Sequence, residues 1–223
     1  MASEKLTLAV DAERKVSALL DVPPAAFACY VLAHGAGAGM THPAMAAVTT
    51  GLAERGIAVL RYQFPYMEQG SKRPDPPALC HAAVRAAVAE AGKRLPKLPL
   101  IAGGRSFGGR MTSQTQAKAP LPGVLGLAFL GFPLHPPGKP SDERAAHLAD
   151  VQVPMLFLQG TRDELADLAL LQPVVARLGE RATLRLFEEA DHSFDVPARS
   201  GRKTAEVRVE LLDALAAWIG ALA

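Results

Sequence analysis

Short continuous apolar runs alternate along this chain with longer segments that suit helices. Runs without polar alternation are typical of strands buried on both faces of a sheet, whereas alternation indicates a strand with one exposed face. Two alternating segments at the start predict an antiparallel hairpin. The predicted strands are residues 5–10, 15–22, 27–33, 57–62, 98–102, 124–132, 155–159 and 183–187.

Helices are predicted between most of these strands. The predicted helices are residues 43–55, 78–95, 107–118, 141–149 with Ser141 as its cap, 165–178 and 203–222. Strands that alternate with helices require crossover connections, so we expect an α/β fold with a mostly parallel, twisted sheet and helices on both faces. Proline-rich segments 63–77 and 133–140 are predicted to be surface loops.

Length and composition agree with one compact unit. The 223 residues, 49% of them hydrophobic, are enough for one sizeable core, and we expect a single domain over residues 1–223. Only about 20 residues separate the predicted strands ending at Phe132 and starting at Met155, which leaves no room for an inserted cap domain.

Charge and cysteine content narrow the class of partner. The net charge of +2 is spread without a basic stripe, which argues against a nucleic-acid partner. Cys29 and Cys80 lie far apart in apolar surroundings, as expected of reduced core thiols. The longest apolar run is too short to span a membrane and the first residues do not resemble a leader, so we expect a cytoplasmic protein.

The strongest chemical signal lies where the strand at 98–102 meets the helix at 107–118. Gly104-Arg105-Ser106-Phe107-Gly108 matches the G-x-S-x-G pattern, in which a sharp strand-to-helix turn projects a serine hydroxyl and needs small residues on either side. The backbone N–H of Phe107 then points to the same spot as that hydroxyl. Ser106 is therefore predicted to be a nucleophile, and Phe107 N–H one donor to an oxyanion.

A serine hydroxyl needs a histidine to accept its proton and a carboxylate to orient that histidine. Read forward from Ser106, Asp163 follows the strand at 155–159, and His192 follows the strand at 183–187. Because the ends of parallel strands meet at one edge of a sheet, we predict that the three side chains converge. Asp167 and Asp191 compete for the acid's role, but we expect the first inside a helix and the second to point elsewhere.

The segment from His34 to Gly39 has two interpretations. The glycines could form a dinucleotide-binding turn, and Arg61 at the end of the next strand could hold the 2′-phosphate of NADP. Alternatively the turn supplies the second oxyanion donor, from the N–H of Ala36 or Gly37. We favour the second, because the glycine spacing departs from G-x-G-x-x-G. His34 is then expected to shape the turn by hydrogen bonding.

The other histidines and Arg105 have ordinary structural roles as an alternative to functional ones. His42, His81, His135 and His147 lack metal-ligand spacing, so no metal site and no cofactor is predicted. Arg105 could meet an acidic substrate, although a role in the fold is favoured. The apolar wall of an open cleft is predicted to contain Tyr66, Met67 and Phe132.

These motifs together resemble those of a small α/β-hydrolase of the dienelactone-hydrolase-like group, in particular the bacterial relatives of testis-expressed hydrolase-like proteins. The resemblance covers nearly the whole chain and implies an α/β-hydrolase fold without a cap. One departure matters. Dienelactone hydrolases proper use a cysteine nucleophile where this chain has Ser106, so their lactone substrate is not implied.

The sequence thus predicts a serine hydrolase that cleaves a small-molecule ester or related acyl bond through an acyl-enzyme intermediate. Ser106 would attack, His192 would transfer protons and Asp163 would orient the imidazole. Two alternatives remain, a hydrolase-fold scaffold that binds partners with little turnover and, less favoured, an NADP-binding protein.

Overall fold

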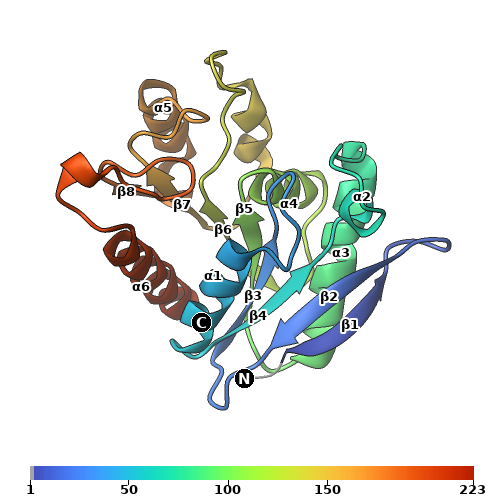
Figure 1. The fold of residues 1–223 in the computed structure, drawn as a ribbon. Coiled ribbons are helices and arrows are strands. Elements are labelled where there is room, and N and C mark those ends of the chain that lie inside the picture. The colour runs from blue at the N-terminus through green and yellow to red at the C-terminus, as the bar shows by residue number, and fades with distance from the viewer. Residues whose placement is uncertain (1–2) are drawn as a thin grey trace.

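The computed structural model describes residues 3–223, which form an eight-stranded sheet flanked by helices (Figure 1). The order across the sheet is β1-β2-β4-β3-β5-β6-β7-β8. The strands are β1 Glu4–Ala9, β2 Lys15–Asp21, β3 Ala28–Ala33, β4 Ile57–Tyr62, β5 Leu100–Arg105, β6 Val124–Leu130, β7 Met155–Gly160 and β8 Ala182–Phe187.

The sheet is mostly parallel, as predicted. Only β1 with β2 and β2 with β4 pair antiparallel, and every other neighbouring pair is parallel. Central strands β3, β4 and β7 are buried at every residue, whereas β1 alternates between exposed and buried positions. This difference follows from position, because central strands are covered on both faces and β1 is an edge.

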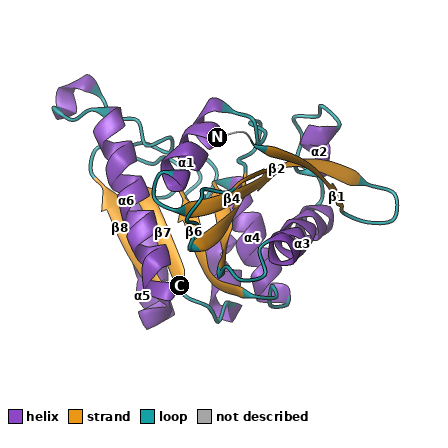
Figure 2. Cartoon of the chain, turned by 90° about the horizontal axis from the view of Figure 1, so that it is seen from below, coloured by secondary structure: helices purple, strands orange, loops and turns teal. Residues whose placement is uncertain are grey.

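Helices cover both faces of the sheet, which Figure 2 shows from below. Leucine, valine and methionine side chains of α1 and α6 join one buried cluster, and those of α3, α4 and α5 join the cluster on the opposite face. The helices are α1 Pro43–Ala53, α2 Pro65–Glu68, α3 Pro77–Arg94, α4 Phe107–Lys118, α5 Leu168–Leu178 and α6 Thr204–Leu222, with 3-10 turns η1 Glu143–Asp150, η2 Gly179–Arg181 and η3 Ala198–Ser200.

The strand predicted over 98–102 is β5, which begins at Leu100 and continues through both glycines to Arg105. Three predicted segments outside the strands also differ from the structure. The loop at 63–77 contains the short helix α2, which begins at Pro65 because proline suits the first helical position and Tyr66 turns into the core. Helix α5 begins at Leu168 rather than at 165, since Asp167 caps it through Ala169 N–H. The segment predicted as a helix over 141–149 is the 3-10 turn η1, with Asp142 rather than Ser141 at the cap position.

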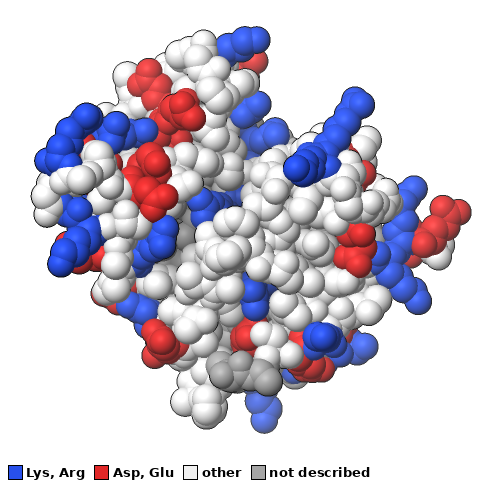
Figure 3. All heavy atoms as spheres, in the orientation of Figure 1, with Lys and Arg blue, Asp and Glu red and all other residues white. Residues whose placement is uncertain are grey.

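The connection between β6 and β7 carries only η1, so no cap domain is inserted at that point of the described chain. Cys29 and Cys80 are buried and free, as predicted. No helix within residues 3–223 is long and apolar enough to cross a membrane. On the face seen in Figure 3, basic and acidic side chains are interspersed around the rim.

Candidate active site

Ser106 occupies a strained turn between β5 and α4. Its backbone has φ 50° and ψ −120°, a conformation that side chains rarely adopt. Glycines on both sides allow close backbone approach: a Cβ at Gly104 would overlap the carbonyl oxygen of Ala33, and one at Gly108 would lie 2.5 Å from that of His34. The elbow therefore packs directly against the end of β3.

Ser106, His192 and Asp163 form a continuous hydrogen-bonded chain. The Nε2 atom of His192 lies 2.8 Å from Ser106 Oγ, and its Nδ1 lies 2.7 Å from Asp163 Oδ2. The carboxylate accepts the proton of Nδ1, which leaves Nε2 free to accept the serine proton. The structure thus brings together the three residues that sequence reasoning selected, each from the loop after a different parallel strand.

The carboxylate of Asp163 is held from several sides. Its side chain is fully buried, and Oδ1 accepts a hydrogen bond of 2.8 Å from the N–H of Leu165. Oδ2, the oxygen that faces His192, also accepts from Nε2 of Gln159. Gln159 is 0% exposed, and its Oε1 accepts a 2.9 Å hydrogen bond from Phe132 N–H.

Sequence reasoning missed Gln159. A signal was present, because it is the single polar side chain among the apolar residues of β7. A buried amide normally needs hydrogen-bond partners, so its position at the end of a buried strand indicated a nearby polar group. Gln159 links the end of β6 to the acid that follows β7.

The two competing carboxylates are engaged elsewhere. Asp191 accepts the N–H groups of Ser193 and Asp195 and so stabilises its own loop, as expected for a residue that points away from His192. Asp167 lies at the start of α5 and not inside it. Neither accepts a hydrogen bond from the imidazole of His192 in the described structure.

Two backbone donors lie beside the Ser106 hydroxyl. Phe107 is the first residue of α4, and Ala36 lies in the turn after β3. Both line the same depression as Ser106. Within residues 3–223 neither N–H donates a hydrogen bond, and the start of α4 adds the positive end of a helix dipole. Gly37, with φ 76°, does not line the depression.

His34 shapes this turn, as the sequence predicted. Its Nδ1 lies 2.8 Å from the carbonyl oxygen of Gly35, and its Nε2 accepts a 3.0 Å hydrogen bond from Phe64 N–H. Both contacts suit one neutral tautomer. Burial lowers the pKa of His34 to about 4, against an ordinary value of 6.5. The ring is therefore a neutral structural element rather than a base.

The depression beside Ser106 has a volume of about 540 Å³ and is lined differently from the prediction. Tyr66 is 1% exposed and Phe132 is 0% exposed. Tyr66 stacks on Phe64, Phe132 packs against other phenylalanines under the sheet edge, and Met67 packs against the same core. The predicted wall of Tyr66, Met67 and Phe132 is thus wrong. The lining instead includes Pro74, Pro77, Pro133, Pro136, Leu165, Arg110 and Arg144.

A second serine and histidine pair joins α4 to η1. Ser113 Oγ is 2.7 Å from His147 Nε2, and the hydroxyl also donates to the carbonyl of Arg110. Ser113 sits inside α4 rather than at a strained turn, and in the described structure no carboxylate accepts a hydrogen bond from His147. This pair has the geometry of a helix-to-turn contact.

The structure argues against the dinucleotide-binding interpretation, because the Arg61 guanidinium is not free to bind a phosphate. Arg61 is 5% exposed and pairs with Asp21 at 3.1 Å, while another nitrogen donates to the carbonyl of Met40. Its guanidinium is therefore committed to the sheet. Separately, residues 3–223 contain no cluster of three or more His, Cys, Asp or Glu side chains that could hold a metal ion.

Comparison with known proteins places this geometry in context. A family model described as an alpha/beta hydrolase domain matches residues 26–220. The structure is similar to dienelactone hydrolase from Anabaena variabilis, with a TM-score of 0.79 and 20% identity over 99% of this chain and 98% of that one. It is also similar to XC6422 from Xanthomonas campestris, described as an α/β serine hydrolase without a lid, with a TM-score of 0.73 and 22% identity over 97% and 94% of the two chains.

A third similar structure is Est1E from Butyrivibrio proteoclasticus with ferulic acid bound, with a TM-score of 0.71 and 17% identity over 95% of this chain and 99% of that one. At identities of 17–22%, these structural similarities show the fold alone. The family match spans most of the chain, including Ser106, Asp163 and His192. The chain belongs to the α/β-hydrolase domain family.

Proposed function

We propose that this protein is a serine hydrolase that cleaves an ester or a related acyl bond of a small molecule. The observation that carries the proposal is the hydrogen-bonded chain from Ser106 through His192 to the buried carboxylate of Asp163. Such a chain makes a hydroxyl nucleophilic at neutral pH without any metal or coenzyme.

In the first half of the reaction, Ser106 Oγ attacks the carbonyl carbon while His192 Nε2 takes its proton. The carbonyl oxygen becomes an oxyanion and accepts hydrogen bonds from the N–H groups of Phe107 and Ala36. The tetrahedral intermediate then collapses, and His192 returns the proton to the departing alcohol. Ser106 is left acylated.

In the second half, water attacks the acyl carbon and His192 again takes the proton. Collapse of this intermediate releases the carboxylic acid and restores the Ser106 hydroxyl. Throughout, Asp163 keeps Nδ1 of His192 protonated and stabilises the imidazolium that forms. The open depression beside Ser106 supports access for small acyl substrates. The structurally similar protein described as an α/β serine hydrolase without a lid supports the same chemistry by analogy.

The test compares Ser106→Ala with Ser113→Ala. Both variants remove a hydroxyl that contacts a histidine, but only Ser106 lies at the elbow. With a panel of p-nitrophenyl esters, S106A should lose on the order of 10⁵-fold in kcat, and S113A should stay near the wild type. A fluorophosphonate probe should label the wild type and S113A but not S106A.

Unchanged hydrolysis by S106A would refute the assignment of the nucleophile. Wild-type protein that neither hydrolyses the panel nor reacts with the probe would instead favour a role as a binding scaffold.

A further inference from the structure

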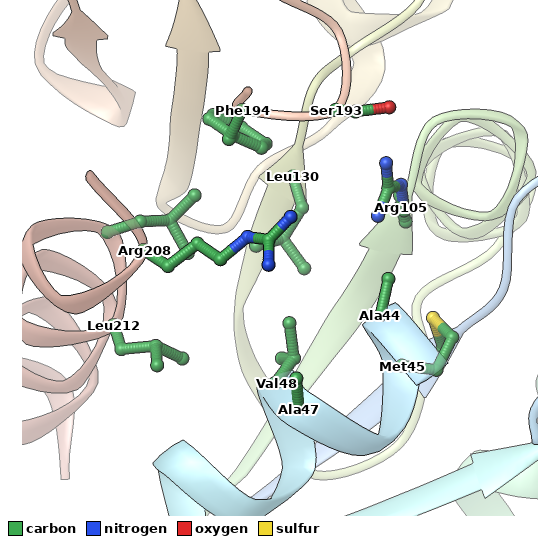
Figure 4. Close-up of a pocket in the computed structure, with 11 residues that line it drawn as sticks. Ala44, Met45, Ala47, Val48, Arg105, Leu130, Ser193, Phe194, Arg208 and Leu212 are labelled. Atoms are coloured by element: carbon green, nitrogen blue, oxygen red, sulfur yellow. The ribbon is translucent and has the colours of Figure 1, made fainter. Parts of the chain in front are cut away.

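A second cavity lies close to the elbow, because Arg105, the residue before Ser106, lines its wall. It opens between α1 and α6, beneath the ends of β5 and β6, and it shares no lining residue with the depression (Figure 4). Its volume is about 70 Å³, which corresponds to roughly five to seven water-sized groups. Most of its wall is apolar, from Met45 and Val48 of α1, Leu130, Phe194, and Leu211 and Leu212 of α6.

One end of this cavity carries the guanidinium of Arg105. Arg105, the residue before Ser106, is half-buried, and within residues 3–223 it forms neither a salt bridge nor a hydrogen bond. Burial lowers the pKa of its guanidinium, which reflects the cost of holding this charge away from water. Asp195 and Asp191 attract this charge from a distance, but no carboxylate forms an ion pair with Arg105 in the described structure.

A second guanidinium reaches the same end of the cavity. Figure 4 shows the side chain of Arg208 extending from α6 across the cavity towards Arg105, above the apolar side chains of α1. Two like charges that face each other favour an anion between them. The carboxylates nearby are engaged. Asp195 forms an exposed ion pair of 2.9 Å with Arg208, and Asp191 accepts the N–H groups of its own loop, which leaves Arg105 as the guanidinium of the two that has no ion-pair partner in the described structure.

We propose that this cavity binds a short aliphatic carboxylate of about four to six carbons. The carboxylate would accept hydrogen bonds from Arg105 and Arg208, and the alkyl chain would lie between Val48 and Leu212. The size of the cavity limits the chain length, and the paired guanidinium groups select an anion over a neutral or cationic head. The site does not require the hydrolytic reaction, since it shares no lining residue with the depression.

Binding is tested by calorimetry and thermal unfolding with pentanoate, pentanol and pentylamine. Pentanoate should bind with a Kd below about 1 mM and raise Tm by about 3–6 °C at ten times Kd. Pentanol and pentylamine should bind at least about tenfold more weakly, because neither offers an anion to the guanidinium groups. Decanoate should also bind weakly, since its chain exceeds the cavity.

Three variants locate the site. Arg105→Gln removes the unpaired charge, and Val48→Phe fills the apolar part while it keeps both guanidinium groups. Each should weaken pentanoate binding at least about tenfold. Arg185→Gln removes an exposed charge from β8, outside the cavity, and should bind pentanoate as the wild type does. It controls for the general effect of net charge.

Wild-type affinity in both R105Q and V48F would overturn the proposal. So would loss of pentanoate binding in Arg110→Gln but not in R105Q, because that result would place the carboxylate in the depression beside Ser106. If R105Q is poorly folded, V48F alone decides, since it leaves Arg105 and Arg208 in place.

Discussion

Replacement of Gln159 by leucine tests what its hydrogen bond to Asp163 contributes while Asp163 itself stays in place. The amide of Gln159 donates to Asp163 Oδ2 and accepts Phe132 N–H, and leucine keeps the volume but makes neither contact. Gln159 does not line the depression, so its loss should reach the reaction only through Asp163 and His192.

The cost in stability follows from these two hydrogen bonds. An unsatisfied buried N–H at Phe132 costs about 1–3 kcal/mol, and the lost hydrogen bond to a charged oxygen costs about 1.5–3 kcal/mol. We therefore expect Gln159→Leu to lower the free energy of unfolding by about 2.5–6 kcal/mol. That is a large part of the 5–15 kcal/mol typical of a folded domain, but a folded population should remain at 15 °C.

The effect on catalysis should be a lower kcat with little change in KM. Without the amide, Asp163 can shift relative to His192 Nδ1, and a displacement of about 1 Å in a catalytic group costs about 100-fold. Complete loss of the acid's orienting role costs about 10⁴-fold, which sets the upper limit. We expect a 10- to 100-fold fall in kcat, measured with p-nitrophenyl butyrate on protein shown to be folded by circular dichroism.

A matched control exists at Gln116 in α4. Its buried amide also caps a backbone N–H, that of Leu121 at 2.8 Å, but it does not contact Asp163. Gln116→Leu should lose about 1–3 kcal/mol of stability and keep its kcat. Folded Q159L with a wild-type kcat, or an equal loss of kcat in Q116L, would refute the positioning role of Gln159.

Three further predictions concern the His34 turn, the glycine beside His192 and the buried ion pair of the sheet. Relative to His34→Gln, the wild type should lose about 1.4 kcal/mol of stability per pH unit as the pH falls from 6.5 towards 4, measured by urea unfolding. The reason is that the unfolded chain binds a proton there and the buried ring does not. Gly131→Ala should lower kcat at least about tenfold in ester assays, because its Cβ would lie 3.3 Å from the His192 ring at a φ of 71°. Asp21→Ala should cost about 3–5 kcal/mol in urea unfolding, since it leaves Arg61 buried without its partner.

The glycine and aspartate predictions each have a control variant, and His34→Gln is itself the comparison for the first. Gly179→Ala has a similar strain, with a φ of 62°, but nothing lies within 4 Å of its Cβ, so its kcat should not change. Asp142→Ala removes an exposed ion pair with Arg177 and should cost less than about 1 kcal/mol. Equal pH slopes for H34Q and the wild type would show that His34 does not carry the acid sensitivity assigned to it.

Sequence reasoning located the residues of the candidate site because the ends of buried strands have their own local sequence signals. Ser106, Asp163 and His192 each follow a buried strand, and parallel strands end at one edge of the sheet, so order along the chain predicts proximity in space. It failed for Tyr66 and Phe132. Apolar residues in a loop can turn inward or outward, and only the packing of the neighbouring phenylalanines decides which.

The hydrophobic pattern by itself determined the α/β class and the edge at which the chemistry gathers, because burial on both faces and short turns are local properties of the chain. Only the tertiary structure decided which polar groups meet. Gln159 and Phe132 are 27 residues apart, and Arg105 and Arg208 line one cavity although 103 residues separate them along the chain. Such contacts depend on how strands and helices pack against one another, and no pattern along the chain encodes a side chain's partner across that distance.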